Sequence, residues 1–320
     1  MSGRLAQKIL EGDEKSAARL ISLIEEGEQE GYRELSLLYP HTGKAHVIGV
    51  TGPPGAGKST ITGKLAVVLA KEGKKVGVVA IDPTSMQGKG ALLGDRLRMK
   101  DAESEGIFIR SMANRGYSGG MARATAGAAC VLEALGKDTV IVESLGAGQA
   151  EKDVFYLCDT TIIVFTPDYG DEIQLLKAGL MEIGDIVIVN KGDLPGTAEA
   201  QRELSICAST RIGTDGWTPP VLVTRADKGE GLTQAAKAIN DHWSFLGRER
   251  RQQKRKEKTR TFVEDLVKEE MWTRFSSAVR GDKECIRITE DAINRKIDPY
   301  SAARQIIEKT LLTIKTPTED

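Results

Sequence analysis

An eight-residue run, Gly52-Pro-Pro-Gly-Ala-Gly-Lys-Ser59, restricts what this chain can fold into more than any other feature. It matches the pattern G-x-x-x-x-G-K-[ST], follows a short apolar run and precedes a helical pattern. The glycines allow consecutive backbone N–H groups to face nucleotide phosphates, and the following helix adds the positive end of its dipole. The run therefore predicts a P-loop. Its nucleotide-binding residues would be Gly52, Pro53, Pro54, Gly55, Ala56, Gly57, Lys58, Ser59 and Thr60.

Phosphoryl transfer at a P-loop needs a fixed cation and a metal ion to counter the charge on the phosphates. Lys58 should reach the β- and γ-phosphates, and Ser59 should ligate Mg²⁺. Glu143 ends an apolar run, where its carboxylate could hold Mg²⁺ through water or orient the attacking water. Asp82 and Asp95 could each be a switch carboxylate, or equally a loop residue in a turn. The predicted catalytic residues are thus Lys58, Glu143, Asp82 and Asp95, and the predicted metal ligands are Ser59, Asp82, Asp95 and Glu143.

A second motif, Asn190-Lys-Gly-Asp193, follows another apolar run far downstream. It resembles the N-K-x-D motif of GTPases. A carboxylate at Asp193 can accept two hydrogen bonds from N1–H and the exocyclic amine of guanine, whereas adenine has no donor at N1. By itself, the sequence Asn-Lys-Gly-Asp also suits an ordinary turn. Because a P-loop precedes it in the same chain, the interpretation as a guanine-binding motif is favoured. We expect GTP or GDP with Mg²⁺ at this site.

Seven short runs rich in β-branched residues alternate with helical stretches, which is typical of a mostly parallel sheet covered on both faces. The runs are His46–Val50, Val76–Ile81, Ile107–Ile109, Thr139–Val142, Thr161–Phe165, Ile186–Val189 and Val221–Val223. The predicted fold is an α/β P-loop NTPase. A helical N-terminal extension would span residues 1–44, the nucleotide-binding domain residues 45–246, and a helical arm residues 247–320.

The predicted arm carries an apolar stripe at helical spacing, namely Val263, Val267, Met271 and Phe275. A lone helix cannot bury such a stripe, so we expect the arm to form a homodimer, with docking on the chain's own nucleotide-binding domain as the alternative. The basic run Arg248–Arg260 contains acids and lacks interleaved aromatics, which indicates a solvated helix face rather than a nucleic-acid groove.

Charge and cysteine content indicate which partners and which cellular compartment to expect. The formal net charge is −1, so no overall field attracts nucleic acid or an anionic membrane. The four cysteines are scattered without a C-x-x-C pair, which favours core thiols over disulfides or a zinc site. Neither a signal peptide nor a membrane span is indicated, and a cytoplasmic location is the expectation.

Several segments together resemble the MeaB/ArgK family, the methylmalonyl-CoA mutase-associated GTPases. Besides the two nucleotide motifs they include AIDPTS at 80–85, GALLGDRLRM at 90–99, FIRSMANRG at 108–116, ESLGAGQAE at 143–151, TPDYGDEIQLLKAGLMEIGDI at 166–186 and DPYSAA at 298–303. The resemblance covers most of the chain. It implies a GTP-hydrolysing chaperone of an adenosylcobalamin-dependent acyl-CoA mutase that gates cofactor loading and protects the mutase.

The resemblance also implies roles for individual residues. Asp82 and Asp95 would belong to the first switch, and Glu143 with Gly146 and Gln149 to the second. Guanine would be selected by Asn190, Lys191 and Asp193. A mobile loop that senses the mutase would contain Asp171, Glu172, Gln174 and Lys177, although acids at that spacing also suit an ordinary helix N-terminus.

One departure from the family pattern concerns the last guanine loop, where Arg225-Ala226 stands in place of the usual Ser-Ala. The backbone N–H of Ala226 could still reach the base oxygen, but Arg225 cannot make the customary serine contact. Three alternatives stay open at this point: a P-loop kinase of a small molecule or protein, a metallochaperone GTPase, and an adaptor with a vestigial nucleotide site.

Overall fold

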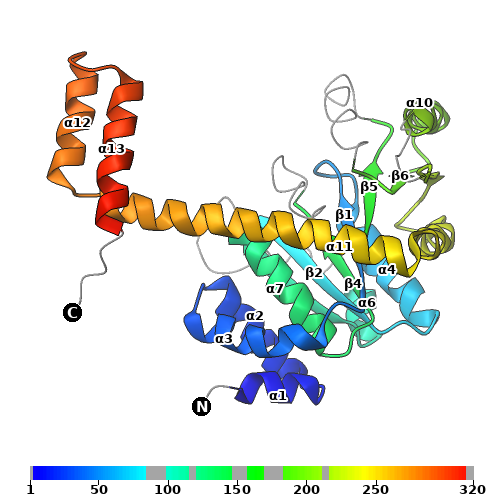
Figure 1. The fold of residues 1–320 in the computed structure, drawn as a ribbon. Coiled ribbons are helices and arrows are strands. Elements are labelled where there is room, and N and C mark those ends of the chain that lie inside the picture. The colour runs from blue at the N-terminus through cyan, green and yellow to red at the C-terminus, as the bar shows by residue number, and fades with distance from the viewer. Residues whose placement is uncertain are drawn as a thin grey trace. The chain divides into compact units, whose positions relative to one another are not determined.

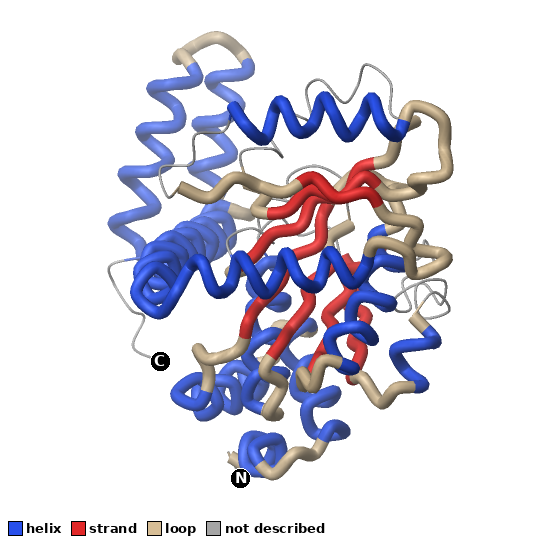
Figure 2. The backbone as a smooth tube through the Cα atoms, turned by 90° about the vertical axis from the view of Figure 1, so that its right-hand side faces the viewer, coloured by secondary structure: helices blue, strands red, loops and turns tan. Residues whose placement is uncertain are grey.

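A parallel β-sheet forms the centre of the fold. The computed structural model describes residues 3–83, 99–114, 120–145, 157–168, 183–210 and 216–314. Within that part of the chain the seven predicted runs are all strands: β1 (His46–Thr51), β2 (Val76–Pro83), β3 (Phe108–Asn114), β4 (Thr139–Glu143), β5 (Thr160–Phe165), β6 (Ile186–Val189) and β7 (Val221–Val223). They form one seven-stranded sheet in the order β3-β2-β4-β1-β5-β6-β7, and every pairing within it is parallel. Figures 1 and 2 show strands side by side with helices packed around them. The predicted α/β fold is confirmed.

Both faces of the central strands are buried, which explains why their sequences are apolar throughout. In β4, Val140 and Val142 face one hydrophobic core and Ile141 faces another, and all three are fully buried. This alternation follows from the two-residue repeat of a strand. A sheet of this kind requires helices on both sides.

The first face is covered by α4 (Lys58–Lys71), α6 (Lys100–Ser104) and the start of α11 (Leu232–Val279). Ile61 and Leu65 of α4 pack with Ile239 of α11 in the same core as Ile141. Because α4 begins at Lys58, the P-loop residues before it are held between β1 and a well-packed helix.

The second face is covered by α7 (Gly120–Ala134), by the N-terminal helices and by α10 (Thr197–Thr210). The N-terminal helices are α1 (Arg4–Leu10), α2 (Glu14–Glu25) and α3 (Gln29–Leu38), followed by a 3₁₀ turn, η1 (Tyr39–His41). Ile9, Leu20 and Ile24 share one core with Leu132 of α7. The buried carboxylate of Glu34 joins α3 to α1, since it accepts hydrogen bonds from the backbone N–H groups of Gly3 (2.6 Å) and Ala6 (2.8 Å).

The chain divides into two compact units, residues 1–258 and 259–320. In the first unit the basic part of α11 differs from its predicted role as a solvated face. Arg255 contacts both carboxylate oxygens of Asp159, at 2.9 and 2.7 Å, and Lys254 donates to the carbonyl oxygen of Asp159 at 2.9 Å. Lys258 donates to the carbonyl of Cys158. These side chains anchor α11 to the start of β5, a role that a charge pattern alone does not show.

The second unit holds the end of α11, α12 (Lys283–Ile293) and α13 (Pro299–Ile314). Asp282 begins α12 by accepting hydrogen bonds from the backbone N–H groups of Glu284 and Cys285. Large apolar side chains of this unit are exposed: Val263, Val267, Met271, Trp272, Ile286, Ile293, Tyr300 and Ile307. None of the described helices is both long enough and apolar enough to span a membrane.

Candidate nucleotide site

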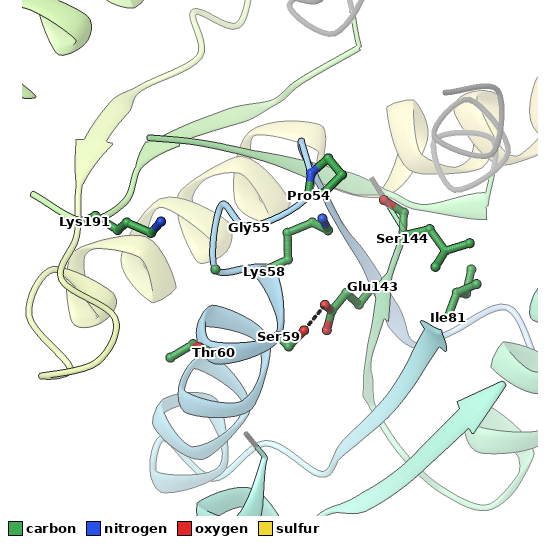
Figure 3. A pocket seen from close by; sticks show the side chains of 11 residues that line it. Pro54, Gly55, Lys58, Ser59, Thr60, Ile81, Glu143, Ser144 and Lys191 are labelled. Atoms are coloured by element: carbon green, nitrogen blue, oxygen red, sulfur yellow. Dashed lines mark hydrogen bonds between the residues drawn. The ribbon is translucent and has the colours of Figure 1, made fainter. Parts of the chain in front are cut away.

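A cavity of about 390 Å³ opens where β1 and β4 end. It is lined by Pro54, Gly55, Gly57, Lys58, Ser59, Thr60, Ile81, Glu143, Ser144, Leu145 and Lys191. Most of these residues belong to the P-loop or to the segment that follows β4, and Lys191 comes from the second motif (Figure 3). The carboxyl edge of a parallel sheet is where open α/β folds bind ligands.

Two P-loop glycines cannot be replaced without moving the backbone. Gly52 has φ +141° and Gly57 has φ +92°, conformations that residues with a Cβ rarely adopt. A Cβ at Gly52 would collide with the carbonyl oxygen of Val164, and one at Gly57 with the side-chain amide of Asn190. The loop is therefore packed closely between β5 and the residue that follows β6.

Lys58 is buried and lies across the P-loop. Its Nζ donates to the carbonyl oxygens of Gly52 (2.9 Å) and Pro53 (3.1 Å). Figure 3 shows the ammonium group near Pro54, and both residues line the cavity. An ammonium held there can meet the negative charge of a phosphate chain without a large movement.

Ser59 and Glu143 lie together in the lining of the cavity. Ser59 Oγ donates to Glu143 Oε1 at 2.6 Å (Figure 3). Both are oxygen ligands of the kind that Mg²⁺ prefers, and phosphate oxygens and water would complete the coordination of such an ion. These two residues thus fit the predicted metal site.

A second hydrogen bond fixes the segment behind Glu143. Ser144 Oγ donates to Thr51 Oγ1 at 2.8 Å, and the Ser144 N–H donates to the carbonyl of Val50 at 2.9 Å. The end of β4 is thereby tied to the strand that leads into the P-loop.

Asn190 links three separate segments around the expected base site. Its Nδ2 donates to the carbonyl of Ala56 in the P-loop at 2.9 Å. Its Oδ1 accepts from Thr224 Oγ1 at 2.9 Å and from the Ala226 N–H at 3.1 Å. From the sequence, the Ala226 N–H is expected to donate to the base oxygen. In the structure it already donates to Asn190 Oδ1, so a bound base would have to share this N–H with Asn190.

The remaining residues of the second motif form a tight turn. Lys191 has a left-handed backbone, with φ +58°, and the Gly192 N–H donates to the carbonyl of Thr224 at 2.9 Å. The Asp193 side chain is about half exposed, at 51%, so a base can reach its carboxylate. Arg225 Nε lies 3.4 Å from Asp193 Oδ1.

Three residues that the sequence did not single out support this site: Thr51, Ser144 and Thr224. Each bonds a segment that is distant in sequence, so its role depends on which strands are neighbours. The only available signal was position, because Thr51, Ser144 and Thr224 directly precede or follow a predicted site residue.

Several predicted residues fall outside what the structure describes. Asp95, Gly146, Gln149, Asp171, Glu172, Gln174 and Lys177 are not among the described residues. For Asp82 the backbone is described, at the end of β2 beside Ala113, but the side chain is not. Their roles stay predictions.

Comparisons with known proteins match this chain to a family of GTPases. The family described as "Methylmalonyl Co-A mutase-associated GTPase MeaB" matches residues 17–280. A relative from Pyrococcus abyssi that is named as a GTPase is 41% identical over 320 residues, covering 97% of both chains. The mitochondrial methylmalonic aciduria type A homolog of Caenorhabditis elegans is 30% identical, covering 90% of this chain and 73% of that one. A solved structure of a LAO/AO transport system kinase has a TM-score of 0.72 at 27% identity, covering 98% of this chain and 97% of that one.

Proposed function

Because the chain belongs to the MeaB family of methylmalonyl-CoA mutase-associated GTPases, we propose that it is the GTP-dependent chaperone of an adenosylcobalamin-dependent acyl-CoA mutase. GTP hydrolysis would gate the loading of the cofactor and protect the mutase. The observation that carries this proposal is the family match over residues 17–280. The Caenorhabditis elegans relative is named a methylmalonic aciduria type A homolog, which supports the same client.

The site geometry suggests how the chain would hydrolyse GTP. Lys58 would leave the carbonyl oxygens of the P-loop to contact the β- and γ-phosphates, where it offsets the negative charge that builds up during transfer. Ser59 and Glu143 would hold Mg²⁺, which supplies further compensation of phosphate charge. Water would attack the γ-phosphorus as its bond to the bridging oxygen breaks, giving GDP and phosphate.

We assign base selection to Asp193. Its carboxylate would accept hydrogen bonds from N1–H and the 2-amine of guanine, while Asn190 holds the base loop against the P-loop. GDP should therefore bind far more tightly than ADP. Equal affinities for the two nucleotides would contradict this assignment.

The client proposal is tested by following, by absorbance, the loading of adenosylcobalamin into a cobalamin-free mutase in the presence of this chain. Transfer should proceed with GTP and slow down with GDP. Lys58→Ala should reduce GTP turnover by at least about 100-fold, since an electrostatic contact to the transition state is lost, and it should abolish the effect of GTP on transfer. Lys71→Ala, an exposed lysine at the other end of α4, is the matched control and should behave as wild type. Transfer that is indifferent to the nucleotide would refute the proposal.

A second candidate activity is transfer of the γ-phosphoryl group to a protein, because the solved relative is named a transport system kinase. GTP labelled at the γ-phosphate separates the two reactions. Label that appears only as inorganic phosphate supports hydrolysis, whereas label on a protein side chain supports the kinase.

A further inference from the structure

Arg225 stands between two carboxylates beside the proposed base site. Its Nε lies 3.4 Å from Asp193 Oδ1, and its Nη1 lies 3.6 Å from Glu230 Oε2. The arginine side chain is 28% exposed, while those of Asp193 and Glu230 are 51% and 57% exposed. Arg225 Nε is buried and makes no hydrogen bond to any described residue, and it forms an ion pair with the carboxylate expected to read guanine.

The backbone fixes Arg225 in this position. Arg225 and Glu230 form an antiparallel bridge, with N–H···O distances of 3.1 and 3.2 Å, that closes the turn between them. Gly231 follows with φ +82°, and a Cβ there would collide with the carbonyl of Val223. The turn is therefore pressed against the end of β7, and the Gly192 N–H bonds to Thr224 on the same strand end.

Arg225 and Asp193 thus lie in two short loops whose backbones are hydrogen-bonded, and these bonds keep the two side chains close together. A guanidinium group 3.4 Å from one carboxylate oxygen would favour the side-chain rotamers of the half-exposed aspartate that keep this ion pair. The ion pair with Arg225 leaves acceptor sites on Asp193 for the base, because an ionised carboxylate has about four lone-pair sites and guanine needs two. Glu230 holds the other end of the guanidinium group and offsets its charge.

We propose that Arg225 is a positioning residue for guanine recognition: it orients the Asp193 carboxylate toward the base. The inference rests on the proposed assignment of Asp193 to guanine. Where a small hydroxyl residue is usual, this chain would use an arginine held by Glu230. Pre-ordering a side chain reduces the entropy lost on binding, so removal of the arginine should weaken guanine binding about three- to tenfold.

The test compares GDP with inosine diphosphate, which keeps N1–H but lacks the 2-amine. Guanine makes two hydrogen bonds to Asp193 and hypoxanthine makes one, so poor orientation of the carboxylate should cost GDP more. Arg225→Ala should lower the ratio of GDP to IDP affinity about threefold or more. Glu230→Gln should produce a smaller change in the same direction. Lys228→Ala, at an exposed position in the same turn, is the control and should leave the ratio unchanged.

A second arm separates positioning from a general effect on the loop. In an Asp193→Ala background the Arg225→Ala change should no longer alter GDP affinity, because there is no carboxylate to orient. Equal weakening of GDP, IDP and ADP by Arg225→Ala would overturn the inference, since a damaged loop affects all nucleotides alike. Tighter GDP binding by Arg225→Ala would also overturn it, because the arginine would then compete with the base. Equal GDP and ADP affinity of the wild type would refute the base site itself, and this inference with it.

Discussion

At the scale of single residues, His46 should control how stability depends on pH. It lies at the start of β1, is stacked on Trp243 at 4.1 Å, and has Nε2 2.7 Å from Thr160 Oγ1. Burial lowers its pKa to about 3. The unfolded chain, with a histidine pKa of about 6.5, binds a proton that the folded chain excludes, so stability is lost as the pH falls below about 6.5.

Urea unfolding at pH 7 and pH 5 measures this loss. The wild type should lose about 2 kcal/mol between the two pH values from this group. His46→Phe keeps a ring against Trp243 but cannot titrate, so its stability should change less over the same interval. If both proteins lose the same amount, His46 does not carry the effect.

Single residues also show what a sequence can and cannot predict. Lys58 and Ser59 could be predicted because the P-loop is one continuous segment whose neighbours along the chain position it. Thr224 and Ser144 could not, because their partners Asn190 and Thr51 become neighbours only through the order of the strands. Arg225 could be recognised as unusual, but its contact with Asp193 required the structure.

At the scale of elements, the ion pair between Arg255 and Asp159 should be a main anchor of α11. The Asp159 side chain is 5% exposed and also accepts from the Val47 N–H at 3.0 Å, and Arg255 donates to the carbonyl of Ala45 at 2.6 Å. Contact with Arg255 and hydrogen bonding outweigh burial and lower the pKa of Asp159. Removing the arginine would leave a buried charge without its partner, which costs about 3–5 kcal/mol.

Arg255→Met should therefore lower the free energy of unfolding of the full chain by about that amount. Arg260→Met is the matched control, since its pair with Glu264 is an exposed one on the same helix and should contribute at most about 1 kcal/mol. The double variant Arg255→Met with Asp159→Asn should recover part of the loss. Similar destabilisation by the two arginine variants would contradict the assignment of an anchor.

The strands and the basic segment of α11 explain why prediction succeeded for one element and failed for the other. Parallel strands are buried on both faces, and this leaves apolar runs that are visible without any knowledge of their neighbours. The run Arg248–Arg260 is predicted as a solvated helix face, but Lys254, Arg255 and Lys258 bind acceptors at Cys158 and Asp159, which come from a distant segment. Charge alone does not reveal whether a basic side chain faces water or a carbonyl.

At the scale of the whole molecule, we propose that the second unit is covered by a second copy of this chain. Val263, Val267 and Met271 are each at least half exposed, and they recur at i+4 steps on one face of α11. A closed twofold dimer would bury such a stripe on both copies at once.

Light scattering of the full chain over a range of concentrations tests the dimer. The wild type should have twice the mass of one chain, and Val267→Lys combined with Met271→Lys should have the mass of one. Lys268→Ala, an exposed residue beside the stripe, is the control and should remain dimeric. A monomeric wild type would reject the proposal, and so would a dimer that tolerates the two lysines.

One nucleotide switch should respond both to GTP and to the mutase, and thermodynamic linkage makes this coupling measurable. The affinity of the chain for an adenosylcobalamin-dependent acyl-CoA mutase from the same source should be measured by calorimetry with Mg²⁺ and either a non-hydrolysable GTP analogue or GDP. We predict affinities that differ by about 5- to 150-fold between the two nucleotides, and the mutase should shift the ratio of the two nucleotide affinities by the same factor. Equal affinity of the mutase for both nucleotide forms, or no binding to either, would contradict the account.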